Sequence, residues 1–516
     1  MTFILAFIPI GLILVLMLGL RWGAARAGGA GYLSALLIAL LFFGAEPVLL
    51  AYSHVKALFL SLDVLLIIWG AFLLYMVADE AGAIRTIGKS LPHLTADKGM
   101  QALVIGWVFA SFLQGVGGFG VPVAVIAPIL VGLGFTPLMA VIIPSIGHGW
   151  GVTFGSLGSS FQALMSATSL PAHVLSPYSA LFLSLSGLVT GLMVAHAASG
   201  WEAVRRLVKP VILLGLVMGA VHFLVAVAGF WNLATFIAAV TGLLLCFPLA
   251  KRFRPERYST TPVKDNDPLE PRALILALAG YAILVIIILL VQFVTPLRDF
   301  LRQVSFQVAF PELVTGLQFV TPAATRSLYI FSHTGMQLFY ASFFSFLLYR
   351  TVGLYRKPKA AAQILAGTTR KVMSSSVSIA SMVSMAVIME NSGMTDTLAQ
   401  GLASVMGQLF PLVAPWIGAL GAFMTGSNTN SNVVFSALQL RTASLLGYLP
   451  ALILAGQTAG ASLASIIAPT KVVVGASTAG MSGREGEVMR KLLTYTLPLV
   501  LLISLFTLLG VWISSW

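Results

Sequence analysis

Apolar stretches close to 20 residues long recur along the whole chain, and they restrict its fold more than any other feature. The predicted spans, about 14 in number, are residues 3–20, 30–51, 58–78, 100–113, 138–157, 179–198, 210–229, 231–249, 273–295, 328–349, 372–390, 403–424, 448–467 and 492–515. Because 58% of the residues are hydrophobic and 9% are charged, no polar stretch approaches the roughly 50 residues of a small soluble domain. The sequence therefore predicts an all-α polytopic membrane protein.

The formal net charge is +13, which in a soluble chain would suggest a nucleic-acid partner. Here the basic residues lie in short loops between the apolar stretches. They cluster at Arg21 and Arg26, Arg85 to Lys98, Arg205 to Lys209, Lys251 to Arg272, Arg350 to Lys371 and Arg484 to Lys491. Such loops stay on the cytoplasmic side of a membrane. We therefore expect a multi-pass protein of the plasma (inner) membrane, surrounded by lipid, with no nucleic-acid partner and with both termini outside.

Two polar motifs interrupt the apolar pattern at corresponding places. The first extends from Gln114 to Pro122 and contains four glycines, and the second extends from Gly426 to Asn432. A shift of 313 positions without a gap superimposes Val121 on Val434, Ala124 on Ala437, Leu133-Gly134 on Leu446-Gly447, Pro137 on Pro450 and Gly147 on Gly460. With the basic loops inside, the helices before the two motifs run in opposite directions. The sequence thus predicts two inverted-topology repeats with broken or re-entrant helices, typical of a transporter with a midplane site.

This pattern divides the chain into four parts. They are N-terminal scaffold helices at 1–57; repeat 1 at 58–209 with the broken motif 114–122; connecting helices at 210–327, with a cytoplasmic loop at 251–272 and an outer loop at 297–327; and repeat 2 at 328–516 with the broken motif 426–432. The prolines and charges of 251–272 predict a solvated linker. Because Cys246 is the only cysteine, no intramolecular disulfide is expected.

The two motifs offer different chemistry to a ligand. The glycines let a ligand approach the main chain, Pro122 suits the first turn of a new half-helix, and the start of such a half-helix binds a carboxylate. The alternative is that the glycines only permit close helix packing. The second motif supplies amides and hydroxyls, which face a cavity or ligand or satisfy the broken backbone. The candidate substrate-binding residues are Gln114, Gly117, Gly118, Phe119, Gly120, His148, Ser427, Asn428, Thr429, Asn430, Asn432, Gln457 and Lys471.

Four charged or titratable residues stand out within the apolar spans. Lys471 precedes three valines, so its ammonium either lies inside the membrane as a carboxylate partner or snorkels to an interface. Glu390, His148 and Asp63 are the candidates for proton coupling; packing explains His148 equally well, and a position at a helix end explains the two acids. The chain lacks a Walker phosphate-binding loop, an HExxH site and a GxSxG elbow, so we expect no enzyme, no cofactor and no metal.

The motifs resemble those of the lactate permease family, proton-coupled carriers of lactate and glycolate. The family pattern Gln-Gly-x-x-Gly-Phe-Gly-x-Pro-Val-Ala matches Gln114 to Ala124, and Leu-Gly-Phe-x-Pro-Leu matches Leu133 to Leu138. The pattern Thr-Gly-Ser-Asp-Thr-x-Ser-Asn-x-x-Phe-x-Ala-Leu-Gln matches Thr425 to Gln439 with one departure, because Asn428 replaces the acid. His148 and Lys471 also replace neutral residues of the family. The resemblance covers most of the chain.

The resemblance implies a secondary active transporter that imports lactate or a related small 2-hydroxy carboxylate by proton symport, with alternating access at the midplane site. Analogy adds an elevator-like movement and a homodimer. Two alternatives stay open. Compared with the family pattern, this site has lost one acid and gained one cation, which favours a more negatively charged ligand. Such a ligand is a dicarboxylate or a sulfonated acid, carried with protons or sodium. A passive anion channel would use the same helix ends around a continuous pore.

Overall fold

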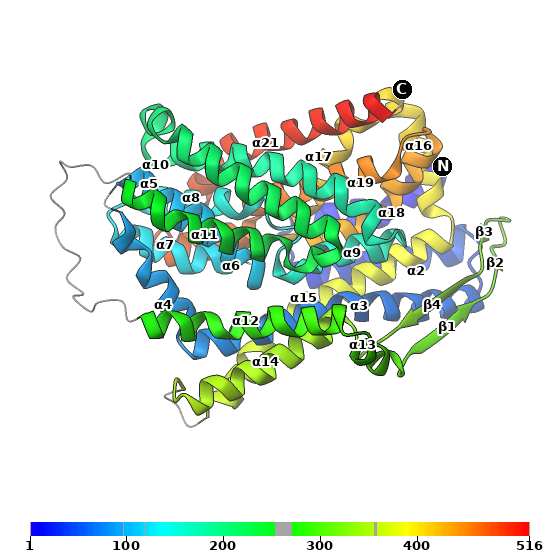
Figure 1. Ribbon diagram of the computed structural model, residues 1–516. Coiled ribbons are helices and arrows are strands. Elements are labelled where there is room, and N and C mark those ends of the chain that lie inside the picture. Colours follow the sequence, from blue (N-terminus) through cyan, green and yellow to red (C-terminus); the bar gives the residue numbers. More distant parts are fainter. Residues whose placement is uncertain (1, 96, 119, 253–270, 356–358, 515–516) are drawn as a thin grey trace.

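The computed structural model describes residues 2–95, 97–118, 120–252, 271–355 and 359–514. The helices are α1 Thr2–Leu14, α2 Ala24–Phe42, α3 Pro47–Glu80, α4 Ala83–Ser90, α5 Lys98–Gln101, α6 Ala110–Val116, α7 Val121–Gly132, α8 Pro137–Gly149, α9 Ser159–Thr168, α10 Ala172–Val225, α11 Ala234–Arg252, α12 Pro271–Phe293, α13 Thr295–Arg302, α14 Thr334–Thr351, α15 Ala360–Asn391, α16 Met394–Met406, α17 Phe410–Thr425, α18 Asn428–Leu445, α19 Pro450–Ala464, α20 Pro469–Thr478 and α21 Glu485–Ser514. The long helices lie side by side along a common axis (Figure 1). The prediction of an all-α polytopic membrane protein is confirmed.

Within the described residues, 10 helical segments are long and apolar enough to cross a membrane. One of them, residues 172–249, contains three of the predicted spans. The chain bends at the non-helical residues Ser199 and Gly200 of α10 and continues into α11 through short helical turns at residues 226–233. Shorter apolar helices such as α7 and α8 add to the membrane part. The predicted total of about 14 spans therefore remains a prediction.

Two helical segments form the centre of the molecule. The apolar windows of the segments Lys98–Val116 and Pro450–Thr478 are completely buried, whereas only a third of the window in Arg272–Phe293 is buried. Peripheral helices instead expose large apolar side chains, for example Leu244 and Leu505. Exposed apolar side chains are stable where lipid surrounds the protein, so the interior helices carry the polar residues and the outer helices face the bilayer.

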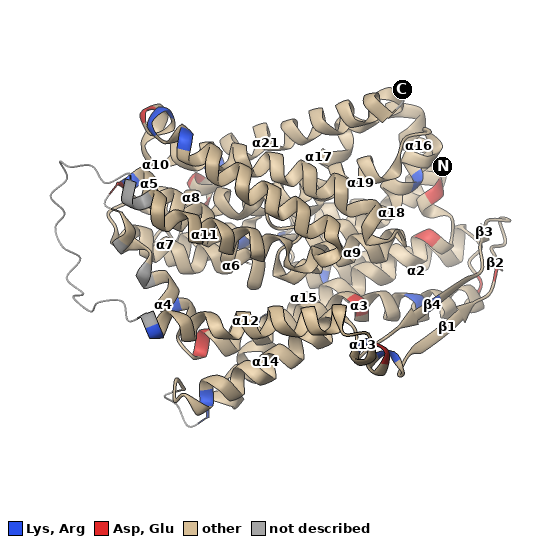
Figure 2. Ribbon diagram, in the orientation of Figure 1, with Lys and Arg blue, Asp and Glu red and all other residues tan. Residues whose placement is uncertain are grey.

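The two ends of the molecule differ. Both termini and the strands lie at one end, whereas the bend of α10 and the junction of α4 and α5 lie at the other (Figure 1). Lys and Arg residues mark that second end (Figure 2). The two termini lie at the same end of the molecule (Figure 1), as the basic loops predict. The side of the membrane on which the termini lie remains a prediction. Most of the expected linker 251–272 falls outside the described residues.

The predicted outer loop, residues 297–327, forms most of four short strands. These strands were not predicted from the sequence. After α13, β1 (Phe306–Phe310) pairs antiparallel with β4 (Ala324–Leu328), and β2 (Leu313–Val314) pairs with β3 (Val320–Thr321). Phe310 and Leu328 are buried, while most of the other strand residues are exposed or half-buried. The strands lie beside the end of α3 (Figure 1).

The chain leaves the helix at both predicted motifs. The helix α6 ends at Val116 and α7 begins at Val121 with proline in its first turn; α17 ends at Thr425 and α18 begins at Asn428. Further breaks precede α9 and α20. The helix α9 packs against α18, and α20 packs against α7 and α8. Four helices, α7, α9, α18 and α20, thus begin at breaks in the chain and form two packed pairs.

Candidate functional site

The starts of α9, α18 and α20 line a small internal cavity of about 20 Å³, which is room for about one water molecule. Its walls are Gln114, Val152, Ser156, Ser159, Ser160, Gly426, Ser427, Asn428, Thr429 and Lys471. Five of the predicted site residues are among them: Gln114, Ser427, Asn428, Thr429 and Lys471. Among the described residues, the lining contains one cation, several hydroxyls and amides, and no carboxylate.

The break between α17 and α18 aims the start of α18 at the cavity. Gly426 ends α17 with a φ of +72°, and a Cβ there would collide with the hydroxyl of Thr470. Ser427 then caps α18, because its Oγ accepts a hydrogen bond of 3.3 Å from the backbone N–H of Asn430. Serine is a preferred residue at this capping position. The first N–H groups of α18 therefore lie at the cavity wall, where they lack partners within the helix.

The start of α9 lies beside the start of α18. Gly158 precedes α9 with a φ of +82°. The hydroxyls of Ser160 and Thr429 are 3.0 Å apart, and Asn432 donates a 2.9 Å hydrogen bond to the carbonyl of Ser160. Two helix N-termini, each with a partial positive charge, thus meet at one side of the cavity.

Lys471 adds a full positive charge from the first turn of α20. Its side chain is 9% exposed, and its Nζ donates a 3.0 Å hydrogen bond to the Ser465 hydroxyl. Among the described residues, no carboxylate forms an ion pair with it. A cation at a helix N-terminus is electrostatically unfavourable. A bound anion would offset both this repulsion and the desolvation of the ammonium.

Two amide oxygens of the cavity lack hydrogen-bond donors. Asn428 donates from Nδ2 to the Thr153 hydroxyl at 3.0 Å, but its Oδ1 is buried and has no partner in the described part of the chain. The Oε1 of Gln114 is also buried and has no hydrogen-bond partner among the described residues. An unsatisfied buried acceptor costs about 1–3 kcal/mol. The cavity therefore favours a ligand that brings a hydrogen-bond donor as well as a negative charge.

The glycines of the first motif shape this region without lining the cavity. Gly118 has a φ of +52°, and a Cβ there would collide with the Ser156 hydroxyl. Gly117 packs against the ring of Tyr75, and Gly120 is the left-handed residue before α7. Phe119 lies outside the described residues.

Three further candidate substrate-binding residues form hydrogen bonds to neighbouring helices and do not line the cavity. Asn430 donates to the Ser378 hydroxyl at 2.9 Å, and Asn432 donates to Thr458 at 2.9 Å. Gln457 donates to the Ser431 hydroxyl at 3.1 Å. These bonds join α18 to α15 and α19, so the structure gives these amides packing partners.

His148 is completely buried in α8 near the cavity but does not line it. Its Nδ1 lies 2.6 Å from the carbonyl oxygen of Pro144. Because a carbonyl only accepts, Nδ1 carries a hydrogen in this contact. The other ring nitrogen, Nε2, has no partner among the described residues.

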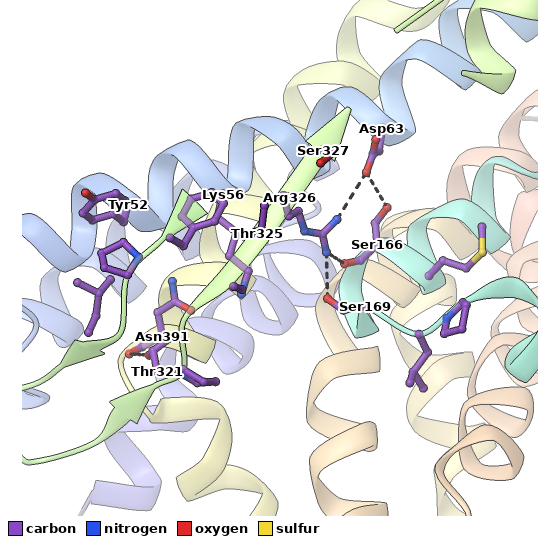
Figure 3. A pocket seen from close by; sticks show the side chains of 18 of the residues that line it. Tyr52, Lys56, Asp63, Ser166, Ser169, Thr321, Thr325, Arg326, Ser327 and Asn391 are labelled. Carbon is purple, nitrogen blue, oxygen red and sulfur yellow. Dashed lines mark hydrogen bonds and ion pairs between the residues drawn. The ribbon is translucent and has the colours of Figure 1, made fainter. Parts of the chain in front are cut away.

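The two carboxylate candidates lie near a second pocket, beside the strands. A carboxylate oxygen of Asp63 is 3.6 Å from a guanidinium nitrogen of Arg326 in β4 (Figure 3). A carboxylate oxygen of Glu390 is 3.3 Å from the Nζ of Lys56. Burial lowers the pKa of the Arg326 guanidinium, and the neighbouring acids Asp63 and Glu390 raise it. The structure thus separates these acids from the cavity.

Sequence reasoning did not single out Ser159, Ser160 or Arg326. A signal for the serines was present, because serines after a glycine often cap or begin a helix. No local pattern distinguishes Arg326 from the other basic residues of the outer loop, since its importance depends on its contacts with α3 and α9.

Known proteins similar to this chain point to one family. The L-lactate permease family profile matches residues 2–514. An L-lactate permease from Salmonella typhimurium is 27% identical, with 93% of this chain and 91% of that protein covered. The glycolate permease GlcA of Escherichia coli is 27% identical, with 99% and 96% covered.

A solved structure extends the similarity to the fold. The crystal structure of the YdaH transporter from Alcanivorax borkumensis superimposes with a TM-score of 0.51 at 16% sequence identity and covers 90% of this chain and 89% of that chain. At this identity the likeness concerns the fold alone. The family profile covers nearly the entire sequence, and the chain therefore belongs to the L-lactate permease family.

Proposed function

We propose that this chain is a secondary active transporter that imports lactate, glycolate or a related small 2-hydroxy carboxylate by proton symport. The observation that carries the proposal is the cavity in which the Lys471 ammonium and the starts of α9 and α18 meet without a lining carboxylate. The relatives named as lactate and glycolate permeases support the substrate class. A permease family also favours transport over enzymatic chemistry.

The cavity suggests how a 2-hydroxy acid binds. The carboxylate accepts hydrogen bonds from Lys471 and from the free N–H groups at the helix starts. The 2-hydroxyl donates to Oδ1 of Asn428 or Oε1 of Gln114, the two acceptors without donors in the described chain. A simple carboxylate without the hydroxyl would leave these acceptors unsatisfied.

Inverted repeats and alternating access are part of the proposal. The series α7, α8, α9 and the series α18, α19, α20 each follow a break in the chain. The Ser462 hydroxyl donates a 2.8 Å hydrogen bond to the carbonyl of Gly149, exactly 313 positions earlier, which is the repeat offset. Contact between equivalent residues is what a two-fold axis through the site would produce. Such repeats can exchange conformations and expose a central site to either side in turn.

Substrate binding requires the site to open, because the cavity of about 20 Å³ has room for about one water molecule. We propose that the helices that line it move relative to α2, α3, α14 and α15, in an elevator-like manner. The coupling proton is assigned to one of three groups: His148 near the cavity, or Asp63 and Glu390 near the second pocket.

Uptake into proteoliposomes tests the function. Purified protein is reconstituted, and radiolabelled L-lactate uptake is measured under separately imposed proton and sodium gradients, with glycolate, malonate and a sulfonated acid as competitors. Accumulation of lactate above its external concentration, driven by an inward proton gradient alone, is the expected result. Equilibration without accumulation would identify an anion channel. Accumulation that requires sodium, or strong competition by malonate or the sulfonated acid, would support the alternative carriers.

A further inference from the structure

A second pocket, of about 500 Å³, lies between α3, α9, α15 and the strands. Its volume falls within the range of small-molecule binding sites. Residues at its rim, including Thr325 and Ser327, are exposed, so the pocket is accessible from the end of the molecule that carries the strands. In Figure 3, Arg326 lies between Asp63, to which a dashed line joins it, and Lys56.

The described lining of this pocket contains more cations than carboxylates. Lys56 and Arg326 line it together with one carboxylate, Asp63, while Glu390 pairs with Lys56 but does not line it. The distance of 3.6 Å between Arg326 and Asp63 exceeds the roughly 2.7–2.9 Å of a close charge-assisted hydrogen bond. The guanidinium charge is therefore only loosely compensated.

Neutral groups at the end of α9 hold Arg326 in place. Its Nη2 donates to the carbonyl oxygen of Ser166 and to the hydroxyl of Ser169, each at 3.0 Å, as drawn in Figure 3. A guanidinium carries five N–H donors. These two bonds therefore orient the group and leave other N–H donors for a ligand. This geometry leaves Arg326 able to bind an incoming carboxylate.

One face of α9 joins this pocket to the internal cavity. Ser159, Gln162, Ser166 and Ser169 follow one another at spacings of three, four and three residues, which places them on one side of a helix. Ser159 lines the cavity and the other three line the pocket. At 1.5 Å per residue the row extends about 15 Å, half of the ~30 Å hydrocarbon core. A continuous polar face thus leads from the end of the molecule to its centre.

We propose that the 500 Å³ pocket is a docking site for the small carboxylate, in which Arg326 binds the anion before it moves along the polar face of α9 to the cavity. The inference rests on the proposed function, because it assigns this pocket to the same substrate. It adds a second binding site, separate from Lys471, and gives the strands a role in forming it.

Protection of an engineered thiol tests this site without requiring transport. Thr325→Cys places a thiol at the pocket, in a chain whose only native cysteine is buried. Saturating lactate is expected to slow maleimide labelling of this thiol about fivefold or more. The same protection is expected when Lys471→Ala disables the cavity, and it should disappear with Arg326→Gln. Arg326→Lys, which keeps the ion pair with Asp63, should retain weaker protection. Val314→Cys, an exposed thiol on β2 outside the pocket, should be unaffected by lactate.

The outcomes separate this inference from the function on which it rests. Equal protection in the Arg326→Gln variant, or loss of protection in Lys471→Ala, would overturn the docking site. Proton-driven uptake by the wild type without any thiol protection would also reject the docking site and leave the transport function standing. Protection without uptake would retain the site and reject transport.

Discussion

At the residue scale, the chemistry depends on a lysine in an unusual place. Lys471 is buried at the start of a helix and lacks a carboxylate partner among the described residues. Both features make the charged side chain costly. A protein retains such a group where a ligand stabilises it, and the family resemblance makes that ligand a small carboxylate.

Lys471→Ala should therefore raise the KM for lactate about 10- to 100-fold, because a hydrogen bond to a charged group contributes about 1.5–3 kcal/mol. Initial uptake rates in proteoliposomes measure the effect. Lys209→Ala removes an exposed lysine of α10 and should behave as the wild type. Normal uptake by Lys471→Ala would show that the ammonium does not bind the anion.

The unpartnered oxygen of Asn428 predicts selectivity for hydroxy acids. Lactate should inhibit uptake at about one-tenth of the concentration that propionate requires, because only lactate brings a donor for this acceptor. In Asn428→Ala the two inhibitors should become similar, as seen in competition curves. If Asn428→Ala still prefers lactate to propionate, the hydroxyl of lactate binds another residue, such as Gln114.

At the element scale, breaks in helices bring the site together. Gln114, Asn428 and Lys471 could be predicted from the sequence, because polar residues inside apolar stretches require a reason. Ser159 follows a glycine and could have been predicted to begin a helix, but its place at the cavity depends on the packing of α9 against α18. Arg326 could not be predicted, since its position depends on the packing of β4 near α3. The strands escaped prediction because each has at most 5 residues, too few to show a clear alternation of apolar and polar side chains.

The left-handed break at Gly118 should be intolerant of a side chain. Gly118→Ala adds a Cβ at a φ of +52° that collides with Ser156, and backbone strain of this kind costs about 1–3 kcal/mol. A lower thermal unfolding temperature in detergent is expected. Gly132→Ala, at the exposed end of α7 with no atom near the added Cβ, is the matched control and should not lower that temperature, because alanine is the better helix former.

At the scale of the whole molecule, the proposed transport requires the cavity of about 20 Å³ to widen around a substrate. The starts of α9 and α18 are held together at Ser160 and Thr429, whose hydroxyls are 3.0 Å apart. If these helices separate when substrate enters or leaves, a covalent link between them will stop the cycle. The pairing of α9 with α18 and of α20 with α7 makes this interface a candidate gate.

Ser160→Cys/Thr429→Cys should lose lactate uptake after oxidation and regain it after reduction, because a disulfide between the two positions prevents that separation. Each single substitution, treated with the same oxidant, controls for the loss of the hydroxyl. Full uptake by the oxidised double variant, with the cross-link demonstrated by mass spectrometry, would show that α9 and α18 move as one unit.

The uncompensated ammonium of Lys471 has an electrical consequence. A carrier without substrate holds one excess positive charge at its centre, whereas a bound carboxylate cancels that charge. The coupling proton of the proposed symport restores one positive charge, so the loaded form and the empty form carry the same charge. Movement of the loaded form and return of the empty form each take this charge through part of the membrane field, which acts on it with up to about 2.3 kcal/mol per 100 mV. A membrane voltage should accordingly slow one of these two steps and speed the other, while a complete cycle moves no net charge.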